Sequence, residues 1–253
     1  MTENIKTYTV KSERKILNQE NKTAFRKAIE DWDFETAGII KISGNENSKF
    51  PINNSKKKYR IDSDEIEKIA RNITNRGIKS IIIHSGDDEY FDSDLISHII
   101  FSVKDTADVK ILLSCGIRSL EELRSWKIAG ASEYFLHIKQ DACFNDEVYR
   151  MFFIKLTKTG LDAGIMIDKD LSENYFAKIK DMSGKSVKYF FFNSFDKSKS
   201  ELSALIKKAK ENYPDVSIII SEKLFRKHKK YIEKEINRKS DLLAVDFTPL
   251  KYC

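Results

Sequence analysis

The most informative polar segment of the sequence is His84-Ser85-Gly86-Asp87-Asp88, which continues directly from an apolar run. A glycine at such a point lets the backbone approach a ligand closely, and carboxylates can accept hydrogen bonds from an ammonium or hydroxyl group. The residues expected at this ligand are Ser85, Gly86, Asp87 and Asp88, together with Ser114, Lys139 and Asn193, which end other apolar runs. The alternative is a turn whose acidic residues cap the next helix, and for Asp92 and Ser93 we favour that alternative.

A lysine at a comparable position offers a different chemistry. Lys139 closely follows His137, and a neighbouring cation can lower the pKa of a lysine so that it forms a Schiff base with a carbonyl compound. Asp87, Asp168 or Asp246 could then move protons. The alternative for Lys139 is an ordinary ion pair at the protein surface, which is the commoner arrangement for a lysine.

The cysteines and histidines show no spacing typical of a metal site. The cysteines are far apart in the chain and form no CxxC pair: Cys115, Cys143 and Cys253. We therefore expect no metal and no disulfide, with Cys115 as a small buried side chain. His84 is expected in the core or at its rim, and His98 and His228 on helix surfaces.

Eight short apolar runs rich in Ile, Val or Phe must position these side chains. They are 38–43, 79–86, 109–116, 132–140, 161–168, 186–195, 216–222 and 241–248. Runs of this kind, alternating with amphipathic stretches in a chain of 253 residues, predict a single (β/α)8 barrel, complete or partly open. An open doubly wound sheet is the alternative. A predicted helix over Lys22–Asp33 precedes the first run, so we expect an N-terminal extension over residues 1–36 and a barrel over residues 37–253.

Several residues between the apolar runs are typical helix signals. Ser119 and Glu122 have the spacing of a capping box, and Gly130 is a stop signal for the helix that they begin. Asp62 or Ser63 is the predicted N-cap of an earlier helix. These signals fall where a barrel of this kind requires helices between successive strands.

The charge distribution names no partner. The net charge of +6 is the difference between 45 basic and 39 acidic residues, which are scattered along the chain. The densest basic stretch, Phe225–Lys239, is predicted to be an amphipathic surface helix rather than an anion-binding patch, so we expect no nucleic-acid partner. No apolar run is long enough to span a bilayer, and Met1–Glu20 has no apolar core of a secretory signal. We therefore expect a cytoplasmic protein with no membrane partner.

Three motifs occur in a fixed order on the predicted strands. Ser85–Asp88 follows the second strand, Ser114–Gly116 follows the third, and Lys127–Tyr134 leads into the fourth. They resemble motifs of the radical S-adenosylmethionine barrels, in particular the group of [FeFe]-hydrogenase maturase, methylornithine synthase and biotin synthase. That group has a Ser-Gly-Glu-Asp type turn, a Ser-x-Gly turn and a Lys-x-Ala-Gly-Ala-x-x-Tyr segment at these places. Asp241–Tyr252 likewise resembles its last strand.

The same resemblance implies that the cofactor ligands are missing. In the family, a Cys-x3-Cys-x2-Cys motif after the first strand binds a [4Fe–4S] cluster, and an ungapped alignment places Glu46, Phe50 and Asn53 at its cysteine positions. Lys139 stands where the family has an acid that contacts S-adenosylmethionine, and Asp168-Lys169-Asp170 replaces a glycine-rich turn. We therefore expect no cluster, and the binding of S-adenosylmethionine stays open.

Two functions from different classes are compatible with this sequence. The first is a cluster-less barrel that binds a small molecule at its mouth and acts as a binding or accessory protein in cofactor or amino-acid biosynthesis, as a partner subunit or a homodimer. The second is an enzyme with non-radical, lyase- or aldolase-like chemistry, in which Lys139 works with Asp87 or Asp168 on a small carbonyl compound.

Overall fold

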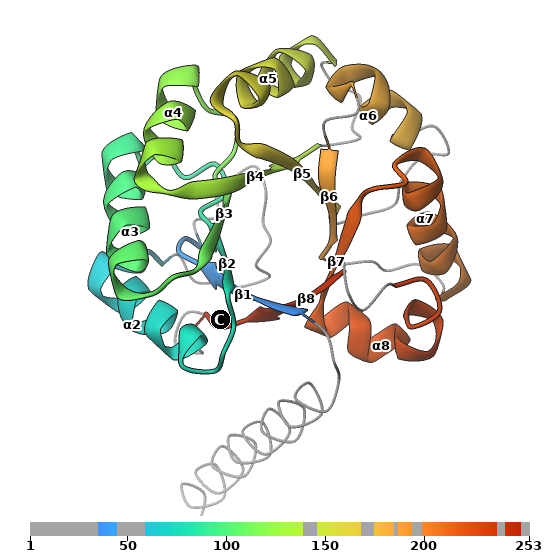
Figure 1. The fold of residues 1–253 in the computed structure, drawn as a ribbon, viewed down its shortest axis with the longest axis horizontal. Helices are drawn as coiled ribbons and strands as arrows, with labels where there is room; N and C mark the ends of the chain where they lie inside the picture. Colours follow the sequence, from blue (N-terminus) through green and yellow to red (C-terminus); the bar gives the residue numbers. More distant parts are fainter. Residues whose placement is uncertain are drawn as a thin grey trace, which may run out of the picture. The chain divides into compact units, whose positions relative to one another are not determined.

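Eight parallel strands form a closed barrel, with helices around its outside (Figure 1). The computed structural model describes residues 35–44, 59–138, 146–167, 175–184, 187–193, 199–236 and 241–248. Strand β1 (Glu35–Lys41) pairs with both β2 (Ser80–His84) and β8 (Leu242–Asp246), so the sheet has no free edge. The other strands are β3 (Lys110–Ser114), β4 (Ala131–His137), β5 (Asp162–Ile167), β6 (Val187–Phe192) and β7 (Ser217–Ser221). The predicted (β/α)8 barrel is confirmed in its complete form, and the open doubly wound sheet is excluded.

Within the described residues, one helix follows each strand from β1 to β7. These helices are α2 (Ser63–Thr74), α3 (Ser93–Thr106), α4 (Leu120–Ala129), α5 (Asp146–Thr159), α6 (Tyr175–Ser183), α7 (Lys199–Asn212) and α8 (Glu222–Ile232). None of the described helices is long and apolar enough to cross a membrane. Residues 1–34, with the predicted helix over Lys22–Asp33, lie outside the described residues, so the division of the chain into an extension and a barrel stays a prediction.

The sequence signals for helix ends are confirmed at three helices. Asp62 caps α2 by accepting a hydrogen bond from the Glu65 amide at 2.8 Å. Asp92 caps α3 in the same way, as favoured for that residue. Ser119 and Glu122 form the complete capping box of α4, and Gly130 ends that helix in the left-handed conformation.

Helix α8 differs from its prediction in the place of His228. The helix begins at Glu222, because the Ser221 hydroxyl at the end of β7 accepts from the Leu224 amide and caps the helix there. His228 is only 3% exposed, so its expected place on the helix surface is wrong. The reason is its spacing, since it lies four residues after Leu224 and four before Ile232, on the same buried stripe.

Apolar side chains fill the middle of the barrel. The lumen core consists of Ala37, Ile39, Ile82, Leu112, Phe135, Met166, Phe191, Ile219 and Ala244, all at most 4% exposed. Toward the amino ends of the strands lies a polar group in which Lys110 pairs with the fully buried Glu133 and donates a hydrogen bond to the Tyr189 hydroxyl at 2.9 Å. Because apolar side chains fill its middle, the lumen is a packed core and not a channel.

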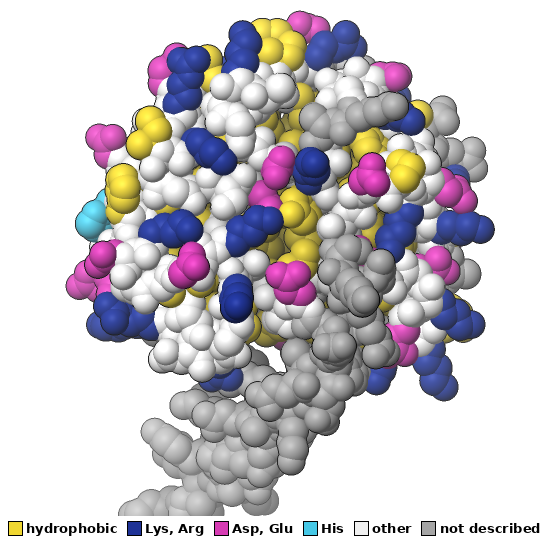
Figure 2. Space-filling model, viewed as in Figure 1, with side chains coloured by type: hydrophobic (Ala, Val, Ile, Leu, Met, Phe, Trp, Pro, Cys, Tyr) yellow, Lys and Arg dark blue, Asp and Glu magenta, His cyan; other side chains and the backbone are white. Residues whose placement is uncertain are grey.

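On the face seen in Figure 2, basic and acidic side chains are intermingled.

Close packing at Gly164 predicts that this core does not tolerate an added methyl group. A Cβ atom at Gly164 would lie 2.4 Å from the Phe135 ring, so Gly164→Ala must displace that ring or the strand. We expect a loss of about 1–3 kcal/mol in the free energy of unfolding, measured with urea. The exposed Arg124→Ala on α4 is the control, with an expected change within about 0.5 kcal/mol. Equal stability of Gly164→Ala and the wild type would contradict the packing described.

Candidate functional site

A layer of polar side chains lies at the carboxyl ends of the strands, directly beyond the lumen core. Side chains two residues apart on a strand face the same side, so each residue that follows a core residue by two positions also faces the lumen. On seven strands or just past their ends these residues are Lys41, His84, Ser114, His137, Asn193, Ser221 and Asp246. We call them the mouth layer. In barrels of this fold, the carboxyl ends of the strands are where ligands bind.

An ion pair joins two charged residues of the mouth layer, Lys41 on β1 and Asp246 on the neighbouring strand β8. Lys41 Nζ donates to Asp246 Oδ2 at 2.7 Å, and the lysine side chain is 13% exposed while the aspartate side chain is 37% exposed. Thr248 fixes both residues, because its hydroxyl accepts from the Lys41 amide at 3.0 Å and its own amide donates to Asp246 Oδ1 at 2.9 Å. The lysine and the carboxylate therefore have defined positions at the mouth.

His84 is the neighbour of Lys41 in the adjoining strand and is held in its neutral form. The two residues are register partners between β1 and β2, and His84 is 6% exposed. Burial, together with the charges of Lys41 and His137, lowers the pKa of His84 from 6.5 to about 3 against the opposing effect of Asp246. Its Nδ1 atom forms no hydrogen bond within the described residues. A neutral imidazole donates from one nitrogen and accepts at the other, so it can bind a hydroxyl or carbonyl group.

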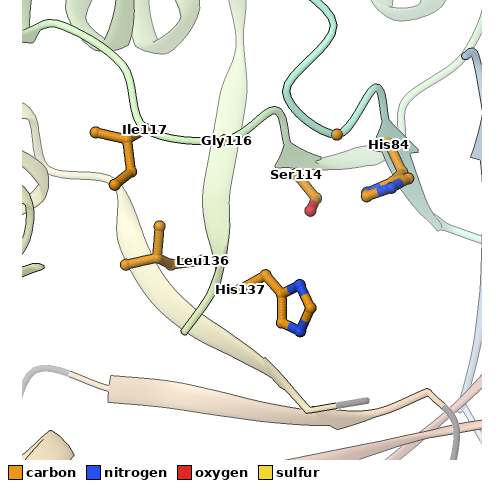
Figure 3. Close-up of a pocket in the computed structure, with 7 residues that line it drawn as sticks. His84, Ser114, Gly116, Ile117, Leu136 and His137 are labelled. Atoms are coloured by element: carbon orange, nitrogen blue, oxygen red, sulfur yellow. The ribbon is translucent and has the colours of Figure 1, made fainter. Parts of the chain in front are cut away.

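A small pocket opens beside His84 between the ends of β2, β3 and β4 (Figure 3). Its lining residues are His84, Gly86, Ser114, Gly116, Ile117, Leu136 and His137. Figure 3 shows the side chains of His84, Ser114 and His137 extending into one shared space from separate strands. The pocket has a volume of about 20 Å³, which is enough for water or a small polar group.

Asp87 and the two glycines shape one wall of this pocket. Gly86 and Gly116 both have positive φ angles, 62° and 78°, which residues with a side chain rarely adopt. A Cβ atom at Gly116 would lie 2.0 Å from Asp87 Oδ1, so the Asp87 carboxylate covers this glycine directly. With Ser114, the structure thus places three of the predicted ligand residues, Gly86, Asp87 and Ser114, at the pocket or against its wall.

Asp88 has a different environment from the one expected for a ligand residue. Its carboxylate accepts from the Ser43 hydroxyl at 2.5 Å, from Arg60 Nε and Nη2 at 3.0 and 2.9 Å, and from the Tyr90 amide at 3.2 Å. Burial alone would raise its pKa, but the hydrogen bonds from Arg60, Ser43 and Tyr90 outweigh burial and lower the pKa. Four donors occupy about the full acceptor capacity of a carboxylate. In this structure Asp88 therefore fastens the loop after β1 to the loop after β2.

Two further predicted ligand residues, Ser85 and Asn193, form hydrogen bonds with the backbone or through their own backbone at the strand ends. The Ser85 hydroxyl donates to the Gly86 carbonyl at 3.2 Å, within the turn after β2. The Asn193 amide donates to the Ile167 carbonyl at 3.0 Å, and its own carbonyl accepts from the Ser221 hydroxyl. Cys115 is fully buried, as expected, and burial raises the pKa of its thiol. Of this group, Asn193 belongs to the mouth layer.

The remaining sequence-predicted positions lie outside the described residues. They are Lys139 and Asp168 among the candidate catalytic residues, and Glu46, Phe50 and Asn53 among the positions of the lost cluster ligands. The described residues at either side of segment 45–58 are side by side, because Ser43 and Arg60 form an antiparallel bridge and the Gly44 amide donates to the Tyr59 carbonyl at 3.0 Å. The roles assigned to these five residues stay predictions.

Lys41 is the mouth residue that sequence reasoning missed. It lies inside the predicted apolar run 38–43, whose residues are expected in the core of the barrel rather than at its mouth. The usable signal was its position two residues after Ile39 in the run GIIKIS, where a charged side chain shares a face with apolar ones. A lysine inside such a run must reach the strand end or find a buried partner.

Part of the chain is similar in sequence to a curated protein. No family model matches the chain. The [FeFe] hydrogenase maturase subunit HydE of Thermotoga maritima is 38% identical over 84 residues, which are 33% of this chain and 24% of that protein. The match therefore spans about a quarter of that relative's length. The chain has a distant similarity to the radical S-adenosylmethionine maturases over part of its length.

Solved structures extend the likeness in fold to most of the chain. The HydG maturase of the [FeFe]-hydrogenase has a TM-score of 0.67 at 11% identity, covering 84% of this chain and 58% of that one. Methylornithine synthase (PylB) has a TM-score of 0.67 at 16% identity, covering 88% and 75%. Dihydrodipicolinate synthase from Bacillus clausii has a TM-score of 0.56 at 12% identity, covering 84% and 68%. At these identities the likeness concerns the barrel fold alone.

The hydrogen bonds of Asp88 predict a large loss of stability when its carboxylate is removed. Asp88→Ala leaves the Ser43 hydroxyl and the Arg60 guanidinium without their acceptor, and we expect a loss of about 2–4 kcal/mol in the free energy of unfolding. Asp105→Ala, at an exposed position on α3, should change it by less than about 0.5 kcal/mol. Urea unfolding measures both. If the two variants are equally stable, Asp88 does not fasten the loops.

The lowered pKa of His84 predicts a specific pH dependence of folding. The unfolded chain binds a proton at this residue below pH 6.5, whereas the native protein does so only near pH 3. The contribution of His84 to stability is therefore complete above pH 6.5 and decreases by about 1.4 kcal/mol per pH unit below it. In His84→Asn this part of the decrease between pH 6.5 and 4 should be absent. The control is His98→Asn, at an exposed position on α3; parallel curves for the wild type and His84→Asn would contradict the assignment.

Proposed function

We propose that this protein binds a small polar molecule at the mouth of a barrel that holds no iron–sulfur cluster, and that it acts as a binding or accessory protein in cofactor or amino-acid biosynthesis. The mouth layer carries this proposal. Polar residues at the ends of seven strands lie above an apolar core, and a small-molecule site usually combines apolar walls with a few such polar groups. Barrels of this fold bind their ligands at this end.

The electrostatics of the mouth favour a ligand that forms hydrogen bonds over a strongly charged one. The ammonium of Lys41 is already compensated by Asp246, and His84 is neutral. Ser114 and Asn193 add a hydroxyl and an amide to the same layer. Such a site offers both donors and acceptors while its own charges are balanced, as suits a small hydroxylated or carbonyl compound.

The donor set of this chain does not suit the cluster of the radical enzymes. Such a cluster needs three thiolates at one place, whereas the sequence has cysteines only at positions 115, 143 and 253. Cys115 is fully buried after β3, and among the described residues no group of three or more His, Cys, Asp and Glu side chains could hold a metal ion. With Glu46, Phe50 and Asn53 at the aligned positions, we propose that the chain does no radical chemistry and leave S-adenosylmethionine as one ligand to test.

The biosynthetic role rests on the relatives. HydE and HydG are named as maturases of the [FeFe] hydrogenase, and PylB as methylornithine synthase. We propose that this chain works in a comparable pathway in the cytoplasm, alone as a homodimer or with a protein partner, and without nucleic acid or membrane as partners. The alternative function is a non-radical lyase- or aldolase-like enzyme using a lysine such as Lys139, and the inward-facing Lys41 is the observation that favours it.

A ligand screen with a blocked mouth tests the proposed function. Ser114→Leu places an aliphatic side chain in the pocket, and Ser125→Leu makes the same change at an exposed position on α4. A thermal-shift screen covers S-adenosylmethionine, nucleotides, amino acids and small oxo compounds. We expect a ligand that stabilises the wild type and Ser125→Leu but not Ser114→Leu. A ligand at about 100 times its dissociation constant adds about 2.7 kcal/mol of stability.

Two results would count against this function. A ligand that stabilises Ser114→Leu as strongly as the wild type binds elsewhere, so the mouth is not the site. A stoichiometric [4Fe–4S] absorption spectrum after reconstitution with iron and sulfide would show that the chain holds a cluster. We expect no such spectrum.

A further inference from the structure

Lys41 lies between a carboxylate and an imidazole, and the three side chains come from three neighbouring strands. Asp246 on β8 accepts from its Nζ at 2.7 Å, and His84 on β2 is its register partner. Both neighbours face the lumen with it, and the charges of Lys41 and Asp246 act on the imidazole of His84. An amine, a carboxylate and a neutral imidazole are thus brought to one place in the mouth.

This arrangement is not that of an ordinary surface ion pair. The Lys41 side chain is only 13% exposed, and its backbone and its carboxylate partner are both held by Thr248. The Asp246 side chain is 37% exposed, so a proton on its carboxylate can exchange with water. The amine is therefore fixed at the end of the lumen, with a proton acceptor in contact with both the amine and solvent.

We propose that Lys41 captures a small aldehyde or ketone at the mouth of the barrel as an imine. The proposal rests on the proposed function, in which the mouth layer is the binding site, and it names the class of ligand. A carbonyl group fits the site because its carbon needs an amine, while its oxygen needs a donor such as the neutral imidazole of His84 or the hydroxyl of Ser114.

The step balances without any further reactant. The Lys41 ammonium gives one proton to the Asp246 carboxylate, and the free Nζ attacks the carbonyl carbon to form a C–N bond. The carbonyl oxygen takes up a proton from the attacking nitrogen to give the carbinolamine. Asp246 then returns its proton to that oxygen and the C–O bond breaks, so water leaves, the carboxylate is restored and a protonated imine remains. In sum, an ammonium and a carbonyl give an iminium and water, with no oxidant, reductant or net change in protons.

Reductive trapping tests this proposal on the full chain. The protein is incubated with pyruvate or glycolaldehyde, reduced with sodium borohydride and mapped by peptide mass spectrometry. We expect the reduced adduct on Lys41, and its loss in Lys41→Arg, which keeps the charge. Asp246→Asn should slow adduct formation by about a hundredfold, because the proton acceptor is lost. Circular dichroism shows whether each variant is folded.

A second ion-paired lysine provides the matched control. Lys210 is also 2.7 Å from an aspartate, Asp241, but lies on α7 away from the mouth layer. Lys210→Arg should keep the adduct on Lys41. An adduct on Lys139, a spread over exposed lysines or no adduct in the wild type would overturn the proposal. If the same carbonyl compounds stabilise the wild type and Lys41→Arg equally, but not Ser114→Leu, the mouth binds them without covalent capture and only this inference fails.

Discussion

The two-residue period of a strand, imposed on a closed ring of eight strands, is the constraint on which the rest of the structure depends. Closure gives each strand one face toward the lumen, so alternate residues from all strands stack in layers. In this chain the middle layer is apolar and the layers at its two ends are polar. The lumen core therefore keeps water out from below, while the mouth layer is open to a ligand from above.

The polar layers are stable because their charges are paired and their histidine is neutral. Lys41 with Asp246 at the mouth and Lys110 with Glu133 at the amino end each combine opposite charges. Burial opposes a second cation beside Lys41, and this keeps His84 in the neutral form. Desolvation makes these groups costly to bury, and it also leaves the imidazole of His84 uncharged and able to form hydrogen bonds with a ligand. A fixed amine and an uncharged imidazole at one place can act together on a ligand.

Much of the fold was predictable because it depends on local patterns. The apolar runs gave all eight strands, and Asp62, Ser119 and Glu122 gave helix starts, because strand burial and capping act within a few residues. The site was less predictable because it depends on register between strands distant in sequence. Asp88 is a residue of the kind that binds ligands, but its carboxylate already accepts hydrogen bonds from Arg60 and Ser43. Lys41 was hidden within an apolar run until its register placed it beside His84.

Lys41 and His84 are register partners at the mouth, and the pKa of His84 measures their proximity directly. Its imidazole can be titrated by NMR in the wild type, in Lys41→Met and in the control Lys210→Met. Removing a positive charge beside a buried imidazole favours the protonated form. We predict that the pKa of His84 rises in Lys41→Met and stays at its wild-type value in Lys210→Met. An unchanged pKa in Lys41→Met would contradict the arrangement of the mouth layer.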